Sequence, residues 1–373
     1  MTPAVKDARK PFSLRVPLLA LTFFAVAVTV IIGIAYRYYR AQKEAIEHEV
    51  RNQLLSIADL KVKEISDWGA QRMDEVRLLM ADRATARVMH RLLSGAGEPS
   101  DRAEVQTWLN EVCLRLHYAT STIVDAQGNP VLSTGAGVAD PIHLRQVAGE
   151  VLGTNRIFFH DLQTGGPANA IHLGLNFPLR EVPDGKPFGA VLLSISPAER
   201  LYPVLRTWPF ESRSGETVLV RREGEEAVYL NDTRFHPDAA LRLRIPLSHG
   251  DNPVVKAVLG AHGIVEGIST RGVPVIAAVR AVPGRLWFLI AKMDAEEVEG
   301  PIRRRGVLLI LATVSLILAV GAAIFALWRR QQLEFYKADL ERQALVGHYD
   351  YLSRFANDII LLLDNHGRIL RCV

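Results

Sequence analysis

Two uncharged apolar stretches decide how this chain is organised: VPLLALTFFAVAVTVIIGIAY at residues 16–36 and GVLLILATVSLILAVGAAIFALW at residues 306–328. They contain 21 and 23 residues. A hydrocarbon core of about 30 Å needs about 20 helical residues, because each residue of a helix rises about 1.5 Å. Aromatic and basic residues suited to a membrane interface end both stretches, at 36–40 and 328–330. We therefore predict two transmembrane helices, 16–36 and 306–328.

The alternative for the first stretch is a cleaved signal peptide. Its apolar run is longer than the usual signal-peptide core of about 7–15 residues. The next residues are Tyr-Arg-Tyr-Tyr-Arg at 36–40, which contain no small-x-small cleavage site. These features favour an uncleaved membrane anchor.

Basic residues give only a weak indication of orientation. They precede the first stretch, but they also follow it and precede the second: Lys6, Arg9, Lys10 and Arg15, then Arg37, Arg40 and Lys43, then Arg303, Arg304 and Arg305. Long folded domains cross a membrane largely regardless of charge. We predict that residues 1–15 are cytoplasmic and that residues 37–305 lie outside.

Composition argues against several classes of function. The net charge is +4, and the basic residues form no stripe interleaved with aromatics, so nucleic-acid binding is not expected. The two cysteines, Cys113 and Cys372, would lie on opposite sides of the membrane and could not pair within one chain. The sequence shows no metal-ligand cluster, Walker loop or GxSxG elbow. We therefore predict no metal, no cofactor and no catalytic residue in this chain.

A long amphipathic helix is predicted from Ala41 to about Leu93. Apolar residues recur at spacings of three and four at Ile46, Val50, Leu54, Ile57, Val62, Ile65, Trp68, Met73, Val76 and Met80. Such a stripe needs a partner surface, which could be its own domain, a twin helix in a dimer, or both. Residues 95–99 then break the pattern, and a second helix is expected from about Ser100 to Leu116.

A strand–turn–strand pattern recurs three times, as TIVDAQGNPVLS at 122–133, VLVRREGEEAVYL at 218–230 and IILLLDNHGRIL at 359–370. In the first and third, an apolar strand ends in Asp-x-x-Gly, where Asp can cap the turn and Gly can adopt positive φ. Three such hairpins in separate segments indicate three related α/β modules.

The residues around the first two hairpins predict small antiparallel sheets with flanking helices. Around the first we expect a helix at 143–152 and strands at 156–162, 171–179 and 189–195. Around the second we expect a helix at 252–259 and strands at 242–247, 263–269, 274–282 and 286–292. A charged helix at 294–305 would lead back to the membrane. The predicted modules are a distal one at 100–208 and a proximal one at 209–295.

The whole arrangement resembles the double Cache sensor region of bacterial transmembrane receptors. The resemblance rests on SGETVLVRREG at 214–224, RGVPV at 271–275 and VPGRLWFLIAKMD at 282–294, together with the order of the parts. The segment ANDIILLLDNHGRIL at 356–370 resembles the opening of a PAS domain. The implied fold class is α+β: two transmembrane helices, a long N-terminal helix, two PAS-like antiparallel-sheet Cache modules, and a PAS domain that begins at 350–373 and is incomplete.

This resemblance implies a sensor in the bacterial cytoplasmic (inner) membrane, with several passes and an extracytoplasmic sensing region. Receptors of this layout are most often sensor histidine kinases, whose catalytic part would lie outside this chain and would act on a cytoplasmic response regulator. Residues 329–349 would then be a signalling helix, and a homodimer through residues 41–80 is expected. The alternatives are the sensor part of a diguanylate cyclase, a phosphodiesterase or a chemoreceptor. A further alternative is a membrane-anchored periplasmic enzyme or binding protein.

In such receptors the distal module usually holds the small-molecule ligand. The candidate ligand-binding residues within 117–195 are His117, Tyr118, Arg145, Phe159, Asp161, His172 and Asn176. Residues two apart share a strand face, which puts His172, Gly174 and Asn176 together and Leu173, Leu175 and Phe177 opposite. For each candidate the competing interpretation is a solvated surface. The amino-acid-binding motif of the family is not found, because Trp108, Arg115 and Tyr118 lack its spacing, so the resemblance leaves the ligand class open.

Overall fold

The computed structural model describes residues 15–135, 141–165, 170–182, 185–355, 361–363 and 369–372. Two compact units divide the chain: residues 45–301 form one, and the segments 1–44 and 302–373 form the other. The predicted cytoplasmic N-terminus lies outside the described residues except for Arg15, and so does the turn of the predicted hairpin at 359–370.

Two long helices carry the apolar stretches. Helix α1 (Arg15–Ala81) has 67 residues and helix α7 (Ala295–Phe355) has 61. Each contains an apolar window long enough to cross a membrane, and neither window is buried by protein. Within this unit, Gly306 faces the ring of Tyr39 and Gly321 faces that of Phe24. These are the two candidate transmembrane helices that the sequence predicts.

The predicted helix 41–93 is in fact two helices. Helix α1 ends at Ala81, and α2 (Arg83–Leu93) begins after Asp82. The Asp82 carboxylate accepts hydrogen bonds from the backbone N–H groups of Ala84 at 3.1 Å and Thr85 at 3.2 Å. Its hydrogen bond from the Thr85 hydroxyl is the main cause of a lowered Asp82 pKa. The break therefore follows from an N-cap residue inside an otherwise helical pattern.

The distal module is a five-stranded antiparallel sheet. Helix α3 (Pro99–Leu116) leads into it, and its strand order is β2-β1-β5-β4-β3. The strands are β1 (Thr120–Asp125), β2 (Pro130–Gly135), β3 (Phe158–Gly165), β4 (Ala170–Leu179) and β5 (Gly189–Ile195). Helix α4 (Pro141–Thr154) packs on β4 and β5. At the β1–β2 turn, the Asp125 carboxylate accepts from the backbone N–H of Asn129 at 2.8 Å, and Gly128 has φ 79°.

The proximal module is a six-stranded antiparallel sheet of order β8-β7-β6-β11-β10-β9. Its strands are β6 (Glu216–Glu223), β7 (Glu226–Tyr229), β8 (Arg244–Pro246), β9 (Gly263–Ile268), β10 (Pro274–Ala281) and β11 (Trp287–Asp294). Helix α6 (Pro253–Val258) packs on this sheet. A short helix α5 (Leu201–Arg206), which the sequence analysis did not predict, connects the two modules. After α7, β12 (Leu361–Leu363) pairs antiparallel with β13 (Ile369–Cys372).

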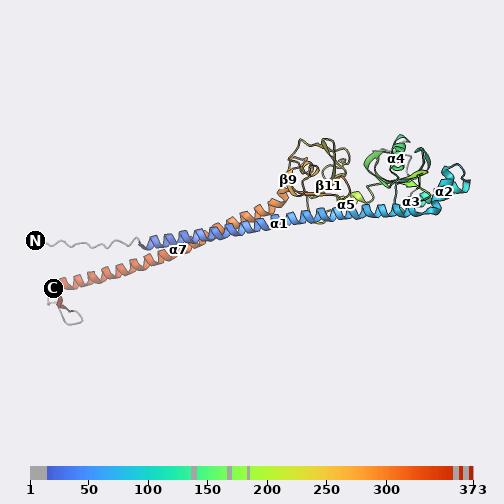
Figure 1. The fold of residues 1–373 in the computed structure, drawn as a ribbon. Helices are drawn as coiled ribbons and strands as arrows, with labels where there is room; N and C mark the ends of the chain where they lie inside the picture. Colours follow the sequence, from blue (N-terminus) through green and yellow to red (C-terminus); the bar gives the residue numbers. More distant parts are fainter. Residues whose placement is uncertain are drawn as a thin grey trace. The chain divides into compact units, whose positions relative to one another are not determined.

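The apolar stripe of α1 is covered by this chain itself. Leu54, Ile65 and Val76 are at most 3% exposed and belong to the same hydrophobic cluster as Phe177 of the distal sheet and Leu289 of the proximal sheet. Figure 1 shows both modules along this helix. Of the three possibilities that the sequence left open, the structure shows that the helix packs against its own domain. The predicted homodimer therefore no longer has an uncovered stripe as its support.

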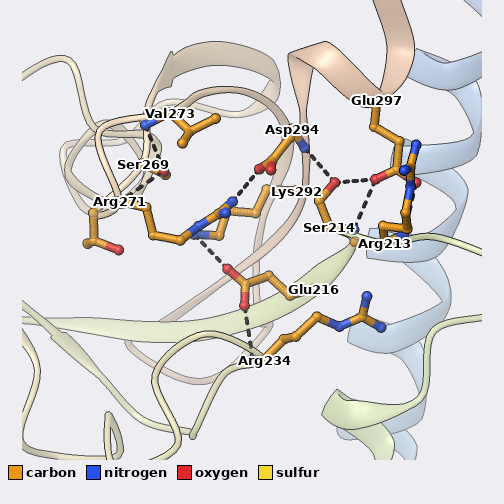
Figure 2. A network of polar contacts seen from close by, with 12 residues as sticks. Arg213, Ser214, Glu216, Arg234, Ser269, Arg271, Val273, Lys292, Asp294 and Glu297 are labelled. Carbon is orange, nitrogen blue, oxygen red and sulfur yellow. Dashed lines mark hydrogen bonds and ion pairs between the residues drawn. The ribbon is translucent and has the colours of Figure 1, made fainter. Parts of the chain in front are cut away.

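A polar network joins the end of β11 to the first turn of α7 (Figure 2). Lys292 Nζ lies 3.0 Å from Glu216 Oε1, and both side chains are about 5% exposed. Arg271 pairs with Asp294, the last residue of β11. The Glu297 carboxylate of α7 accepts hydrogen bonds from the backbone N–H groups of Arg213 at 3.0 Å and Ser214 at 2.9 Å.

Glu297 is held as a carboxylate by these donors. Burial acts to raise the pKa of Glu297, but hydrogen bonds from Ser214, Arg213 and Ser212 outweigh burial and keep that pKa below its usual range. The Ser214 hydroxyl bonds Glu297 and also accepts from the backbone N–H of Asp294 at 3.0 Å. The first turn of α7 is thus tied to the start of β6 and to the end of β11.

We predict that Lys292→Met strongly destabilises the protein, because it leaves the buried Glu216 carboxylate without a counter-charge and with the backbone N–H of Arg234 as its remaining donor. Breaking such a pair costs about 3–5 kcal/mol, whereas replacing both partners with apolar residues is often neutral. Adding Glu216→Leu to Lys292→Met should therefore restore most of the lost stability. Denaturant unfolding of the full chain in detergent measures both effects, with exposed Lys63→Met as a matched control. A Lys292→Met variant as stable as the control would contradict this account.

Candidate functional site

A cavity of about 270 Å³ lies in the distal module between the sheet and α4. Its polar lining consists of Thr120, Thr122, His143, Gln163, His172, Asn176, Ser194 and Ser196. Its larger apolar lining residues are Leu144, Val147, Ile171, Leu192 and Leu193. The wall is thus mostly hydrocarbon with a few polar groups that can fix the orientation of a bound molecule, which is typical of small-molecule sites.

Strand β4 supplies the polar wall by its alternation. His172, Gly174 and Asn176 line the cavity, whereas Leu173, Leu175 and Phe177 are buried in the hydrophobic core on the opposite face. This is the face assignment that residue parity predicts. Ile171 departs from it by also lining the cavity, near the start of the strand.

Three histidines surround the side-chain amide of Gln163. Gln163 Nε2 lies 2.8 Å from His143 Nε2 and 3.3 Å from His172 Nε2, while Gln163 Oε1 lies 2.7 Å from His160 Nε2. His172 Nδ1 is 3.2 Å from the carbonyl of Ala170, so Nδ1 carries the proton and Nε2 accepts from the amide. His143 Nε2 likewise accepts, and His160 donates. This pattern requires a neutral ring at His172, whose Nε2 accepts while its Nδ1 donates.

The chain makes room for these rings with glycine and with a β-bulge. The pairing of β3 with β4 shifts between His160 and Gln163. Because of the bulge, the side chains of His160 and Gln163 can hydrogen-bond each other although they are three residues apart. A Cβ atom at Gly174 would lie 2.8 Å from His160 Cβ, and one at Gly165 would lie 2.9 Å from His172 Cε1. Substitution of either glycine would displace an imidazole.

Asn176 is the polar group best placed for a ligand. The residue is only 3% exposed and lines the cavity, and its side-chain amide, which makes no hydrogen bond within the described part of the chain, is open to the cavity. An amide that is open to a cavity and is not used by another protein group can hydrogen-bond a molecule bound there.

The cavity carries no fixed charge on the lining residues that the structure describes, which include no Lys, Arg, Asp or Glu. Burial lowers the pKa of His172, and nearby His160 adds to that effect. The neutral form of His172 is therefore favoured. Among the described residues, no group of three or more His, Cys, Asp or Glu side chains is arranged to hold a metal ion.

Of the seven sequence-predicted residues, the structure brings only His172 and Asn176 together in the cavity. Phe159 and Asp161 lie instead against Trp287 of the proximal module. The other three lie elsewhere. Tyr118 is buried with its hydroxyl 3.4 Å from Glu75 of α1, while Arg145 is exposed on α4 and His117 is the exposed C-cap of α3. Whether His172 and Asn176 bind a ligand stays a prediction.

Sequence reasoning missed His143, His160 and Gln163. His143 is one of several polar residues in its helix, and His160 and Gln163 come together only because of the bulge. One sequence signal could have indicated the cluster. On the paired strands β3 and β4, Gly174 lies opposite His160, and Gly165 lies against the imidazole of His172.

We predict that the protein loses stability on acidification because of His172. Its pKa is lower in the folded state than the usual value of about 6.5, so the unfolded chain takes up the proton first. Stability from this residue is present above about pH 6.5 and falls as pH drops toward the folded-state pKa. The melting temperature of His172→Asn should therefore fall less than that of the wild type between about pH 7.5 and about pH 5.5.

The control for this experiment is His262→Gln, at an exposed position of the proximal module. It should keep the wild-type pH dependence. An equal fall in melting temperature for His172→Asn and the wild type would refute the assignment.

Comparison with known proteins gives structural neighbours only. No family model and no curated protein matches the chain. The ligand-binding domain of the Pseudomonas fluorescens chemoreceptor CtaA with L-leucine superposes with a TM-score of 0.47 at 15% identity, covering 68% of this chain and 99% of that one. The ligand-binding domain of the Pseudomonas aeruginosa amino acid chemoreceptor PctB with L-arginine gives 0.46 at 16% identity, covering 67% and 97%. The ligand-binding domain of the Campylobacter jejuni chemoreceptor Tlp3 with L-valine gives 0.49 at 13% identity, covering 69% and 97%.

Proposed function

We propose that this chain is the sensing part of a transmembrane receptor of the double Cache type, which binds a small molecule in the distal cavity. The observation that carries the proposal is the amide of Asn176, which is open to a cavity of about 270 Å³ and makes no hydrogen bond to the described residues. The fold supports it, because two candidate membrane helices bracket the two sheet modules and β11 continues directly into α7.

The cavity favours a ligand with a neutral hydrogen-bonding group and an apolar body. An ionised group buried without a counter-charge pays a large desolvation cost. The described lining offers amide, hydroxyl and imidazole groups instead, beside Leu144, Val147 and Leu192. We infer that the neutral group of the ligand bonds Asn176 and that its apolar part lies against these side chains.

For the output we propose a sensor histidine kinase in the bacterial inner membrane, with residues 37–305 extracytoplasmic. It would act as a homodimer on a cytoplasmic response regulator. Helix α7 continues to Phe355, and the paired strands β12 and β13 follow it, as the start of a PAS domain would require. A diguanylate cyclase, phosphodiesterase or chemoreceptor output uses the same layout and is the alternative. The anchored enzyme or binding protein is disfavoured because it needs no such continuation.

A ligand screen tests the binding function. We expect at least one member of a library of neutral amides, sugars, small carboxylates and amino acids to raise the melting temperature of the full chain in lipid nanodiscs. Asn176→Leu should abolish that increase, because it removes the amide and keeps the side-chain size. Asn52→Leu, at an exposed position on α1, is the matched control and should preserve it. An increase that survives in Asn176→Leu would place the ligand elsewhere.

The coding sequence beyond residue 373 tests the output. A histidine-containing dimerisation helix followed by an ATPase region would support the kinase. A Gly-Gly-Asp-Glu-Phe loop would instead indicate a diguanylate cyclase. A methyl-accepting helical hairpin would indicate a chemoreceptor.

A further inference from the structure

The bulge in β3 has two sides with different neighbours. His160 and Gln163 hydrogen-bond each other at the cavity, where Gln163 also contacts His143 and His172. The two residues between them, Asp161 and Leu162, contact the proximal module instead. Four consecutive residues therefore connect the candidate ligand site to the other module.

The contacts on the proximal side are specific and short. Asp161 Oδ1 accepts a hydrogen bond from Trp287 Nε1 at 2.8 Å, and Asp161 Oδ2 lies 3.1 Å from Arg221 Nη1. The same Arg221 nitrogen donates to the carbonyl of Leu162 at 2.7 Å. Trp287 is 1% exposed and Leu162 is fully buried, so these groups cannot shift without moving their neighbours.

An arginine completes the junction. The guanidinium carbon of Arg285 lies 3.2 Å from the ring centroid of Phe159 and 5.3 Å from that of Trp287. Burial lowers the pKa of Arg285 to about 10, and Asp161 acts in the opposite direction. On the other side, Gly69 of α1 leaves room for this side chain, since a Cβ there would lie 3.4 Å from an Arg285 nitrogen. The junction thus joins β3, α1 and the start of β11.

We propose that residues 160–163 are the coupling element that reports occupancy of the distal cavity to Trp287 and, through β11, to α7. This inference rests on the proposed sensor function and adds the route of its regulation. Trp287 is the first residue of β11, and Asp294, the last, immediately precedes α7. A displaced bulge would therefore act on the strand that enters the membrane-directed helix.

The physical reason is that both N–H groups of the Gln163 amide are already hydrogen-bonded. Its NH₂ group donates to two imidazoles and its oxygen accepts from a third. A ligand that bonds an N–H group of Gln163 or Nε2 of His172 must replace one of these contacts. Because Asp161 is two residues away in the same bulge, a shift of Gln163 changes the position of the carboxylate that holds Trp287. A ligand with different affinity for the two arrangements shifts their populations.

The competing interpretation is a static brace, in which the junction only holds the modules together. The two differ in whether a change confined to the cavity side reaches Trp287. Gln163 makes no contact with Trp287 among the hydrogen bonds and ring contacts of the described residues, so a brace predicts no effect there.

Fluorine NMR of the fluorotryptophan-labelled full chain in nanodiscs provides the test. The chain has five tryptophans, and Trp287→Phe identifies the resonance of Trp287. We expect Gln163→Leu to displace that resonance by more than its line width and Asp161→Asn, on the junction side, to displace it as well. Ser196 lines the same cavity outside the bulge, so Ser196→Ala should leave the Trp287 resonance unchanged. If Gln163→Leu does not fold, Gln163→Asn shortens the side chain and withdraws the amide from the imidazoles.

A Trp287 resonance at its wild-type position in a folded Gln163 variant overturns the coupling, even if the screen finds a ligand that depends on Asn176. A displaced resonance supports the coupling whether or not that screen finds a ligand. The two proposals can therefore fail separately. Displacement by Ser196→Ala to the same extent would also overturn the proposal, because the effect would then not belong to the bulge.

Discussion

The structure depends above all on one helix face. The apolar stripe of α1 is the common wall against which both sheets bury their hydrophobic residues, so Leu54 and Val76 share a cluster with Phe177 and Leu289. Each buried side chain of this size contributes about 1.5–3 kcal/mol. Each sheet buries one face against α1, while its other face forms a separate hydrophobic cluster with α4 in the distal module and with α6 in the proximal module. The two modules therefore share one helix as a common part of their cores.

The proximal module and the distal cavity use polar groups in different ways. In the proximal module, the pairs Glu216–Lys292 and Arg271–Asp294 are charged, and removal of one partner of the buried Glu216–Lys292 pair would leave a buried charge. In the distal cavity, Gln163 makes hydrogen bonds to the imidazoles of His143 and His172. Such bonds have a net value of about 0.5–1.5 kcal/mol each. A ligand can exchange with them at small cost, while the charged pairs stay fixed.

The sequence predicts the architecture well where the signal is periodic. The two candidate membrane helices, both sheets and most strand limits follow from apolar runs and alternation, and parity places His172, Gly174 and Asn176 on one face. It fails where one local group decides the outcome. The carboxylate of Asp82 ends a helix that the stripe alone would continue, and α5 is too short to show a period. The cavity is harder still, because His143, His160 and Gln163 come from separate elements and meet only through the bulge.

That failure is informative about Asp161. In the sequence it stands next to His160, and adjacent polar residues on a regular strand point to opposite faces. The bulge turns this alternation into a division of roles, with His160 and Gln163 at the cavity and Asp161 at Trp287. On a regular strand, one residue separates two that share a face. In the bulge, two residues separate His160 from Gln163. Because both of these residues contact the other module, the extra residue is what allows the same short segment to serve the cavity and the junction at once.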